Sequence, residues 1–251
     1  RIDSSVITVT DKILGSSYSF TVRVAQSADT EITVPMIVSG YGHTLALRAD
    51  GTVWAWGDNT YGQLGDGTYG TSNVDKFVPR QVRIGQNESN TKLLTNIKYV
   101  AAGANSSAAI DQDGLLYVWG NNDNYQTGIT TNTLPISTPV KNTDMSQTID
   151  ITSGNASMMV QKGTGTVNVI GDNTNGKLAV GNNNSVNEIV AAKITDGTDF
   201  TGVLAAAVSS NGGMSAFIMQ DGSIRTVGNN ERGQLGDAIL DNELYPVEVY
   251  S

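Results

Sequence analysis

Residues 40–68, GYGHTLALRADGTVWAWGDNTYGQLGDGT, are the stretch that decides the fold. Two short apolar runs, Thr44–Leu47 and Thr52–Trp56, lie on either side of the dipeptide Asp50-Gly51. Asp-Gly between two strand-like runs favours a β-hairpin, because glycine adopts a positive φ without steric cost. The stretch therefore predicts two antiparallel strands followed by a glycine-rich loop.

The same pattern recurs three more times along the chain. The glycine that ends the hairpin corresponds to Gly57, Gly120, Gly171 and Gly228. The hairpin turn recurs as Asp50-Gly51, Asp113-Gly114, Thr164-Gly165 and Asp221-Gly222. The loop GQLGD occurs at residues 62–66 and again at 233–237, and it returns more loosely in the two middle copies. Short strands and glycine turns that recur about every 50 to 60 residues are typical of a β-propeller or another β array.

The repeats divide the chain into units. We expect four of them, at residues 37–84, 97–143, 148–195 and 203–249. In the second unit, strands are expected at Tyr99–Ala102, Ser107–Ile110, Leu115–Trp119 and Pro139–Lys141. Four antiparallel strands make one propeller blade. The fold class predicted from the sequence is therefore all-β, a β-propeller spanning residues 37–251.

Residues 1–36 do not carry the repeat. They contain three strand-like runs, Val6–Val9, Tyr18–Val24 and Ile32–Met36. The middle run alternates apolar and polar residues, which indicates a half-buried antiparallel strand. This β-rich segment is either the tail of a preceding sandwich module, which we favour, or a set of extra strands docked on the repeats.

Composition excludes several classes of protein. The net charge is −9, and the 15 Lys and Arg residues are scattered, so the chain lacks the basic footprint of a nucleic-acid binder. Because cysteine is absent, disulfide scaffolds and cysteine-based zinc sites are excluded. No apolar run approaches the ~18 residues of a membrane span, so no membrane insertion is expected. The chain opens on Arg1, which predicts a processed chain or a piece of a longer one.

Catalysis is not expected. His43 is the only histidine, and a lone histidine cannot build a catalytic triad without a nucleophile and an orienting acid around it. Acidic pairs such as Asp196 and Asp199 lie in polar loops, where solvated carboxylates are the expected reading. We therefore predict no enzyme activity, no cofactor and no metal, with His43 in a structural role.

Two roles are open for the tryptophans, packing between blades and binding of sugars. Trp56 and Trp119 occupy the same repeat position, which Ile170 and Val227 fill in the later units. An apolar residue in all four units predicts a core between blades. Trp54 precedes Trp56 by two residues and points to the same side of its strand. Stacking of sugars on these rings is the alternative.

The loops after Trp-Gly-x-Asn vary most at their tips. Repeated loops project from one rim of a propeller, and Tyr and Arg are residue types that anchor protein interfaces. The hypothesis is that a partner-binding rim contains Tyr61, Tyr69, Tyr125 and Arg232. The alternative is that these residues have only packing roles in surface loops.

The chain resembles the regulator-of-chromosome-condensation family, in its bacterial type. The family pattern stands in the first unit as Gly40, His43, Asp50-Gly51, Trp56-Gly57-Asp58-Asn59, Gly62-Gln63-Leu64-Gly65 and Pro79. The last unit keeps Asp221-Gly222, Gly228-Asn229-Asn230, Gly233-Gln234-Leu235-Gly236 and Pro246, and the middle units match in part. On this resemblance, the structural repeat positions are His43, Trp56, Gly57, Trp119, Gly120, Gly171 and Gly228.

The resemblance covers about residues 37–250 and implies a ring of seven blades, whereas four are visible. Four blades would leave exposed sheet edges. Three outcomes follow: the chain is part of a longer propeller, it pairs with another copy, or it closes as a four-bladed ring. Of these, the first is favoured and self-association comes second.

A shared fold does not transfer an activity. The function that we expect is a non-catalytic protein-binding or scaffolding module, with a protein partner, in a bacterial extracellular or cell-surface protein. The resemblance implies two alternatives. One is a regulator that exchanges guanine nucleotides on a small GTPase. The other is a secreted propeller that inhibits an enzyme or binds carbohydrate.

Overall fold

The computed structural model describes residues 2–10, 17–25, 33–71, 75–85, 92–131, 133–143, 145–209 and 213–250. It divides the chain into two compact units, Arg1–Ile32 and Thr33–Ser251. The first unit is a single hairpin, in which β1 (Ile2–Thr10) pairs antiparallel with β2 (Ser17–Ala25). The rest of the predicted N-terminal segment, residues 11–16 and 26–32, lies outside the described residues.

The third strand predicted for this segment, Ile32–Met36, is wrong as drawn. Residues 33–35 lie outside any strand, and Met36 begins β3 (Met36–Ser39), which pairs with β4 (His43–Leu47) of the repeat unit. Thr33 is buried, and its hydroxyl donates to the carbonyl of Ile97. Only Met36, the last residue of the predicted run, belongs to a strand, because it pairs with Leu47 and packs against the first hydrophobic core.

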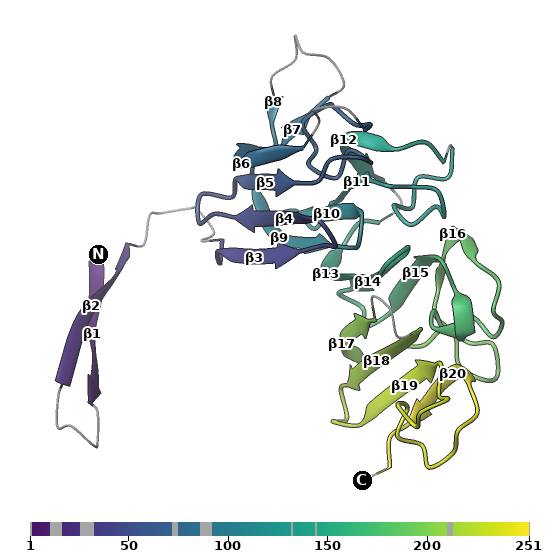
Figure 1. Ribbon diagram of the computed structural model, residues 1–251. Coiled ribbons are helices and arrows are strands. Elements are labelled where there is room, and N and C mark those ends of the chain that lie inside the picture. The colour runs from purple at the N-terminus through teal and green to yellow at the C-terminus, as the bar shows by residue number, and fades with distance from the viewer. Residues whose placement is uncertain are drawn as a thin grey trace. The chain divides into compact units, whose positions relative to one another are not determined.

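Four four-stranded antiparallel sheets follow one another in the second unit (Figure 1). We call them blades 1 to 4. Blade 1 contains β3, β4, β5 (Val53–Gly57) and β6 (Lys76–Gln81). Blade 2 contains β9 (Ile97–Ala102), β10 (Ser106–Asp111), β11 (Leu116–Gly120) and β12 (Ile136–Asn142). Blade 3 contains β13 (Thr148–Ser153), β14 (Ser157–Lys162), β15 (Val167–Gly171) and β16 (Val186–Ala191). Blade 4 contains β17 (Val203–Val208), β18 (Met214–Met219), β19 (Ile224–Gly228) and β20 (Glu243–Glu248).

Three short elements complete the described structure. Strand β7 (Arg83–Ile84), at the end of the first unit, pairs with β8 (Lys92–Leu93) ahead of blade 2. A single 3₁₀ turn, η1, spans Thr174–Gly176. Among the residues that the structure describes, no helix has the length and apolar character of a membrane span.

Each hydrophobic core is shared by two neighbouring blades. One core joins Leu45 and Val53 of blade 1 to Val100 and Trp119 of blade 2. A second core lies between blades 2 and 3, and a third between blades 3 and 4. Each four-stranded sheet has two faces. In this row of four blades, every face that is turned toward another blade is covered by that blade. Burial between repeats is therefore what holds the row together.

Candidate functional site

In every blade, the turn between the first two strands lies beside the loop between the last two. In blade 1, His43 pairs with Gly57, and the amide of Asp58 donates to the carbonyl of Gly42 over 2.8 Å. The same bond recurs as Asn121 to Asn105, Asp172 to Ala156 and Asn229 to Gly213. We call this edge of the blades the rim. It comprises the turns 40–42, 103–105 and 154–156 with Gly213, and the loops 58–71, 121–131, 172–185 and 229–242.

The repeated glycine makes this close approach possible. Gly57 has a φ of +105°, and a Cβ on it would lie 2.3 Å from the carbonyl oxygen of Gly42. A Cβ on each corresponding glycine would likewise lie too close to a backbone carbonyl oxygen. The distance is 2.6 Å for Gly120, 2.3 Å for Gly171 and 2.3 Å for Gly228. A side chain would be strained at that φ and would also strike the backbone. Glycine is therefore required wherever the loop leaves its third strand.

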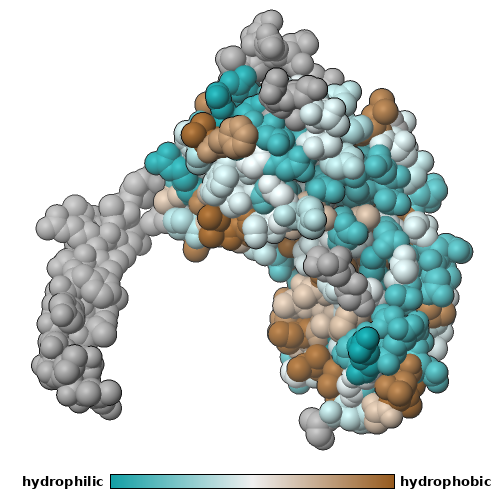
Figure 2. Space-filling model, in the orientation of Figure 1, coloured by the Kyte–Doolittle hydropathy of each residue, from teal (hydrophilic) through white to brown (hydrophobic). Residues whose placement is uncertain are grey.

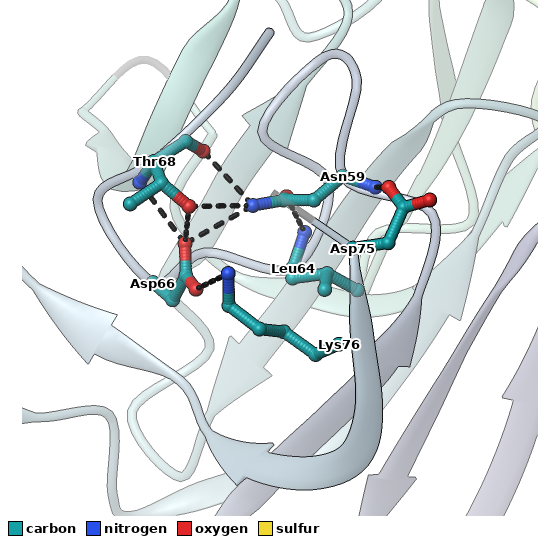
Figure 3. A network of polar contacts seen from close by, with 6 residues as sticks. All are labelled: Asn59, Leu64, Asp66, Thr68, Asp75 and Lys76. Atoms are coloured by element: carbon teal, nitrogen blue, oxygen red, sulfur yellow. Dashed lines mark hydrogen bonds and ion pairs between the residues drawn. The ribbon is translucent and has the colours of Figure 1, made fainter. Parts of the chain in front are cut away.

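A buried asparagine holds each rim loop in place. The Asn59 side chain accepts from the amide of Leu64 over 3.0 Å and donates to Thr68 and Asp66 (Figure 3). Asp66 in turn lies 3.3 Å from the ammonium of Lys76. The equivalent side chains, equally without exposed surface, are Asn122, Asn173 and Asn230. Each accepts from the amide five residues later, at Thr127, Leu178 and Leu235.

A glutamine adds a second tie in three of the loops. The Gln63 amide oxygen accepts from the amide of Tyr61, and its nitrogen donates to Asp58. Gln126 and Gln234 accept in the same way from Asn124 and Arg232. Blade 3 has Lys177 at this position, and its ammonium pairs with Asp172. These internal bonds fix the loop backbones, so the tips are presented in one conformation.

The turns of the rim surround a cavity of about 420 Å³ where blades 1, 2 and 3 meet. Its lining includes Tyr41, Gly103, Asn105 and Asn155. Backbone hydrogen bonds join each of these turns to the turn of the next blade. The amide of Tyr41 donates to the carbonyl of Ala104, and the amide of Ala104 donates to the carbonyl of Gly154. The Tyr41 side chain is 89% exposed. Tyr41 is not among the residues predicted from the sequence, although its position between two turn glycines is a usable signal.

The four residues predicted for a partner-binding rim lie in rim loops of three different blades. Tyr69 is 54% exposed, and Arg232 is exposed as well. Tyr61 is half-buried. Tyr125 is also half-buried, has a φ of +59° and packs against the core between blades 2 and 3. Exposure therefore separates Tyr69 and Arg232 from the two half-buried tyrosines.

His43 is buried beneath the first rim turn. Its Nε2 lies 2.9 Å from the hydroxyl of Ser107 in blade 2, and that hydroxyl donates to the carbonyl of Gln63. Burial lowers the pKa of His43 to about 4, although the nearby carboxylate of Asp58 acts in the opposite direction. The imidazole is therefore neutral at pH 7, and it joins two blades. Ser106, Ser157 and Met214 stand at the equivalent register positions.

The tryptophans differ in their surroundings. Trp119 is fully buried, and its indole Nε1 donates to the Gln63 carbonyl over 2.8 Å. Trp56 was expected in the same kind of core but is only half-buried, because no described residue forms a blade on that side of blade 1. Trp54 lies on the same face, with its ring under the guanidinium of Arg48 at 5.9 Å.

Side chains suited to metal binding do not converge in the part of the chain that the structure describes. No group of three or more His, Asp or Glu side chains is placed there to hold an ion. Asp196 accepts from its own loop at Thr198, and Asp199 pairs with Lys193. These carboxylates stabilise the conformation of their own loop, as acidic residues in turns commonly do.

Comparison with known proteins agrees with the geometry of the blades. The family model described as "Regulator of chromosome condensation (RCC1) repeat" matches residues 50–110, and a second model of the same description matches residues 97–126. Residues 50–126 carry RCC1 repeats. The resemblance to this repeat family is thereby confirmed, and its bacterial type stays a prediction. The first match begins at the hairpin turn of blade 1 and ends in the second strand of blade 2.

Two curated relatives match parts of this chain in sequence. The Rho GTPase-activating protein gacGG of Dictyostelium discoideum is 42% identical over 82 residues, which cover 33% of this chain and 6% of that protein. The human probable E3 ubiquitin-protein ligase HERC4 is 28% identical over 225 residues, covering 88% of this chain and 20% of HERC4. The chain thus spans a fifth or less of the length of these relatives.

Two solved structures share the arrangement of the RCC1 blades. Human WBSCR16 superposes with a TM-score of 0.70 at 23% identity, covering 92% of this chain and 56% of that one. Yeast RCC1 (Prp20), solved with Kap60 bound, superposes with a TM-score of 0.69 at 19% identity, covering 92% and 51%. At these identities the likeness concerns the fold. The predicted all-β propeller is confirmed, and the chain spans about half of these neighbours.

Proposed function

We propose that this chain is a non-catalytic protein-binding module whose rim recognises a partner. The observation that carries the proposal is the rigid rim around the 420 Å³ cavity, with the Tyr41 side chain 89% exposed at its mouth. A preorganised backbone lowers the entropic cost of binding, and exposed tyrosines supply contact area at low conformational cost. Tyr69 and Arg232 extend the same rim.

The charge of the rim indicates the chemistry of the partner. The acidic side chains of the rim that are not buried are Asp58, Asp66, Asp123, Asp172, Glu231 and Asp241. Asp66 pairs with Lys76 and Asp172 with Lys177, and Arg232 is the other basic side chain in these loops. The whole chain carries a net charge of −9. A surface of one sign attracts and orients a partner of the opposite sign, so we propose a protein with a basic segment.

The neutral, buried imidazole of His43 supports the non-catalytic part of the proposal. Its Nε2 is taken by Ser107 in the neighbouring blade, and the side chain is 3% exposed. The relatives include a protein named as a probable ubiquitin ligase, of which the matched part is a fifth. Yeast RCC1 was solved with a protein bound, which supports binding as the role of this fold. Nucleotide exchange remains a prediction from the family resemblance.

The proposal also covers the class of organism and the location of the protein. We propose a bacterial extracellular or surface protein, supported by the low content of charged residues, 16%, and the abundance of turn residues such as the 28 glycines. Fractionation of cells of the source organism, followed by detection of the chain with an antibody, tests this. Recovery in the cytoplasmic fraction alone would contradict it.

The binding proposal is tested by capture on the immobilised chain from an extract of its source, followed by identification of the retained proteins. The variant combines Tyr41→Ala, Tyr69→Ala and Arg232→Ala. The matched control combines Arg48→Ala and Ile149→Ala, two exposed residues outside the rim. We expect a protein retained by the wild type and the control but lost by the rim variant, with at least roughly tenfold weaker binding on titration. Equal retention by all three would refute the proposal.

A further inference from the structure

Two positions, one in the rim loop and one at the start of the fourth strand, are paired within each blade. In blade 1 they are Asp66 and Lys76, whose carboxylate and ammonium groups lie 3.3 Å apart (Figure 3). The loop position follows the buried asparagine of the rim by seven residues. The strand position is the residue that pairs with the repeated glycine. The pairs are Asp66 and Lys76 in blade 1, Ile129 and Ile136 in blade 2, Val180 and Val186 in blade 3, and Asp237 and Glu243 in blade 4.

The first three pairs are complementary, and the fourth is not. The pair of blade 1 combines opposite charges. The two isoleucines of blade 2 pack together in one hydrophobic core, and the two valines of blade 3 pack against another. Blade 4 places two carboxyl groups, those of Asp237 and Glu243, at the same positions. Like charges at short range repel each other, so this pair needs a positive charge that blade 1 supplies from Lys76.

The surroundings of the pair in blade 4 match those in blade 1 bond for bond. The side chain of Asn230 donates to Asp237 over 2.9 Å, as Asn59 donates to Asp66 over 3.1 Å. The backbone amide of Asn230 donates to the side chain of Asn242, the residue before the fourth strand, and blade 1 has the same bond. The equivalence of the two pairs therefore rests on the loop contacts as well as on the sheet register.

The two carboxylate oxygens of Asp237 have different surroundings. Its Oδ1 accepts from Asn230 and from the amide of Ile239 over 3.3 Å. Its Oδ2 has no hydrogen-bond partner in the described part of the chain, although the residue is only 7% exposed. In blade 1 the Oδ1 of Asp66 also serves the loop, and its Oδ2 is the atom beside the ammonium of Lys76. The unpartnered oxygen of blade 4 thus occupies the place where blade 1 holds a cation.

The basic residues of blade 4, Arg225 and Arg232, do not fill this place. The guanidinium of Arg225 lies 3.8 Å from Glu248. Arg232 is exposed and forms no ion pair with any residue that the structure describes. Burial raises the pKa of Glu243, and the charges of Asp237 and Asp241 act in the same direction. The charge imbalance is internal to the blade, because Asp237 is already buried there and the matching pair of blade 1 lies within one blade.

We propose that Asp237 and Glu243 bind a divalent cation, and that Ca²⁺ is the ion that fits best. Carboxylate oxygens are preferred ligands of Ca²⁺, and its coordination tolerates irregular geometry, whereas Mg²⁺ demands a near-ideal octahedron. Since no group of three acidic or histidine side chains is placed to hold an ion in the described residues, main-chain oxygens and water complete the shell around these two carboxylates. The proposal is separate from the partner of the rim, because it concerns a charge inside the blade.

The surface of blade 4 provides a route for the ion. Figure 2 shows hydrophilic residues beside apolar ones on this blade. Asp241 is exposed and Glu243 is half-buried, whereas Asp237 lies deepest. An ion therefore enters past the two outer carboxylates and reaches Asp237 last, and the negative charges along this route attract it.

Calorimetric titration of the full chain with CaCl₂, after dialysis against EDTA, tests the proposal. We expect one site with a dissociation constant of roughly 0.1–1 mM, because the affinity for Ca²⁺ depends on the number of charged ligands, which is small here. Thermal unfolding gives a second readout, and about 10 mM CaCl₂ is expected to raise the unfolding midpoint by roughly 3–10 °C over EDTA. MgCl₂ at the same concentration is expected to raise it less.

Three variants locate the site. Glu243→Lys recreates the ion pair of blade 1, so we expect it to lose the response to Ca²⁺ and to unfold in EDTA at a higher temperature than the wild type. Glu243→Gln keeps the size of the side chain and is expected to bind Ca²⁺ at least roughly tenfold more weakly. Glu188→Gln is the matched control, because Glu188 is an exposed carboxylate on β16 of blade 3, and it is expected to bind like the wild type.

Three outcomes would overturn the proposal. The first is a folded wild type that shows neither heat of binding nor a change of midpoint with Ca²⁺. The second is an equal rise of the midpoint in Glu243→Lys, which would place the ion elsewhere. The third is a wild type that ignores Ca²⁺ but gains stability between about pH 7 and 5, while Glu243→Lys does not. That result would show that a shared proton neutralises the pair.

Discussion

The indole nitrogen of Trp119 donates to the backbone carbonyl of Gln63, 56 residues earlier and in the neighbouring blade. This bond of 2.8 Å connects the two most recognisable parts of the repeat, the tryptophan of one copy and the Gly-Gln-Leu-Gly loop of the copy before it. The repeat is therefore a unit of contact between blades as well as a unit of sequence.

Replacing Trp119 by alanine is expected to destabilise the chain by about 3–5 kcal/mol, because the ring is fully buried between two blades. Trp119→Phe is expected to cost less, since a ring remains and the Ser107 hydroxyl still donates to Gln63. Urea unfolding measures both. Trp56→Ala is the control, because Trp56 is only half-buried. An equal loss in Trp56→Ala would contradict the difference in burial between the two rings.

Asn59→Ala is expected to lower the free energy of unfolding by about 1–3 kcal/mol, because the amide of Leu64 would lose its acceptor inside a buried loop. The rim loop of blade 1 should also become a site of proteolytic cleavage. Denaturant unfolding and limited proteolysis measure the two effects. Asn155→Ala, at an exposed position, should change stability by less than about 0.5 kcal/mol. Similar losses in both variants would contradict the role of the buried amide.

Gly57→Ala is expected to prevent blade 1 from folding correctly, because a methyl group would lie 2.3 Å from the carbonyl of Gly42 at a positive φ. Gly222→Ala is the matched control. Gly222 also has a positive φ, of +85°, but has open space around its Cβ position, so only the backbone strain of about 1–2 kcal/mol applies. Circular dichroism and thermal unfolding compare the two. A Gly57→Ala protein as stable as Gly222→Ala would rule out the close contact.

The stability of the chain should depend on pH through His43. Burial lowers the pKa of His43 to about 4 from an ordinary value of 6.5. The neutral imidazole therefore contributes its full stability above pH 6.5. That contribution falls as the pH drops toward 4, because the unfolded chain binds the proton first, and the total loss is up to about 3 kcal/mol.

The difference in unfolding free energy between the wild type and His43→Gln separates the contribution of His43 from that of the titrating carboxylates. We expect the unfolding free energy of His43→Gln to vary less than that of the wild type between pH 6.5 and 4.5. Because His43 is the only histidine, its ring resonances report the pKa directly by NMR. A midpoint near 6.5 in the folded protein would contradict the burial.

Much of the fold could be predicted because the repeat carries its own local geometry. The turn at Asp50-Gly51 and the glycines at 57, 120, 171 and 228 mark strand ends, since only glycine satisfies their backbone. The N-terminal segment was harder, because the run from Ile32 to Met36 reads as one strand, although its end belongs to blade 1. Local pattern does not show which sheet a strand joins.

The candidate site could be predicted only in part. The loops were found by their variable tips, and Tyr69 and Arg232 are exposed there. Tyr125 looks the same in sequence but has a positive φ and packs on the core between blades 2 and 3, which the local pattern does not show. Tyr41 was missed because the cavity beside it forms from turns of three blades that are far apart along the chain.

The sequence by itself determined the strands, the turns and the four-fold repetition, because these depend on propensities and backbone angles within a few residues. Tertiary structure alone decided which equivalent positions are buried. Trp56 and Trp119 occupy the same place in their repeats, yet one is half-buried and the other fully buried. The reason is physical: the burial of a residue on a blade face depends on whether another blade covers that face, and no local pattern encodes this.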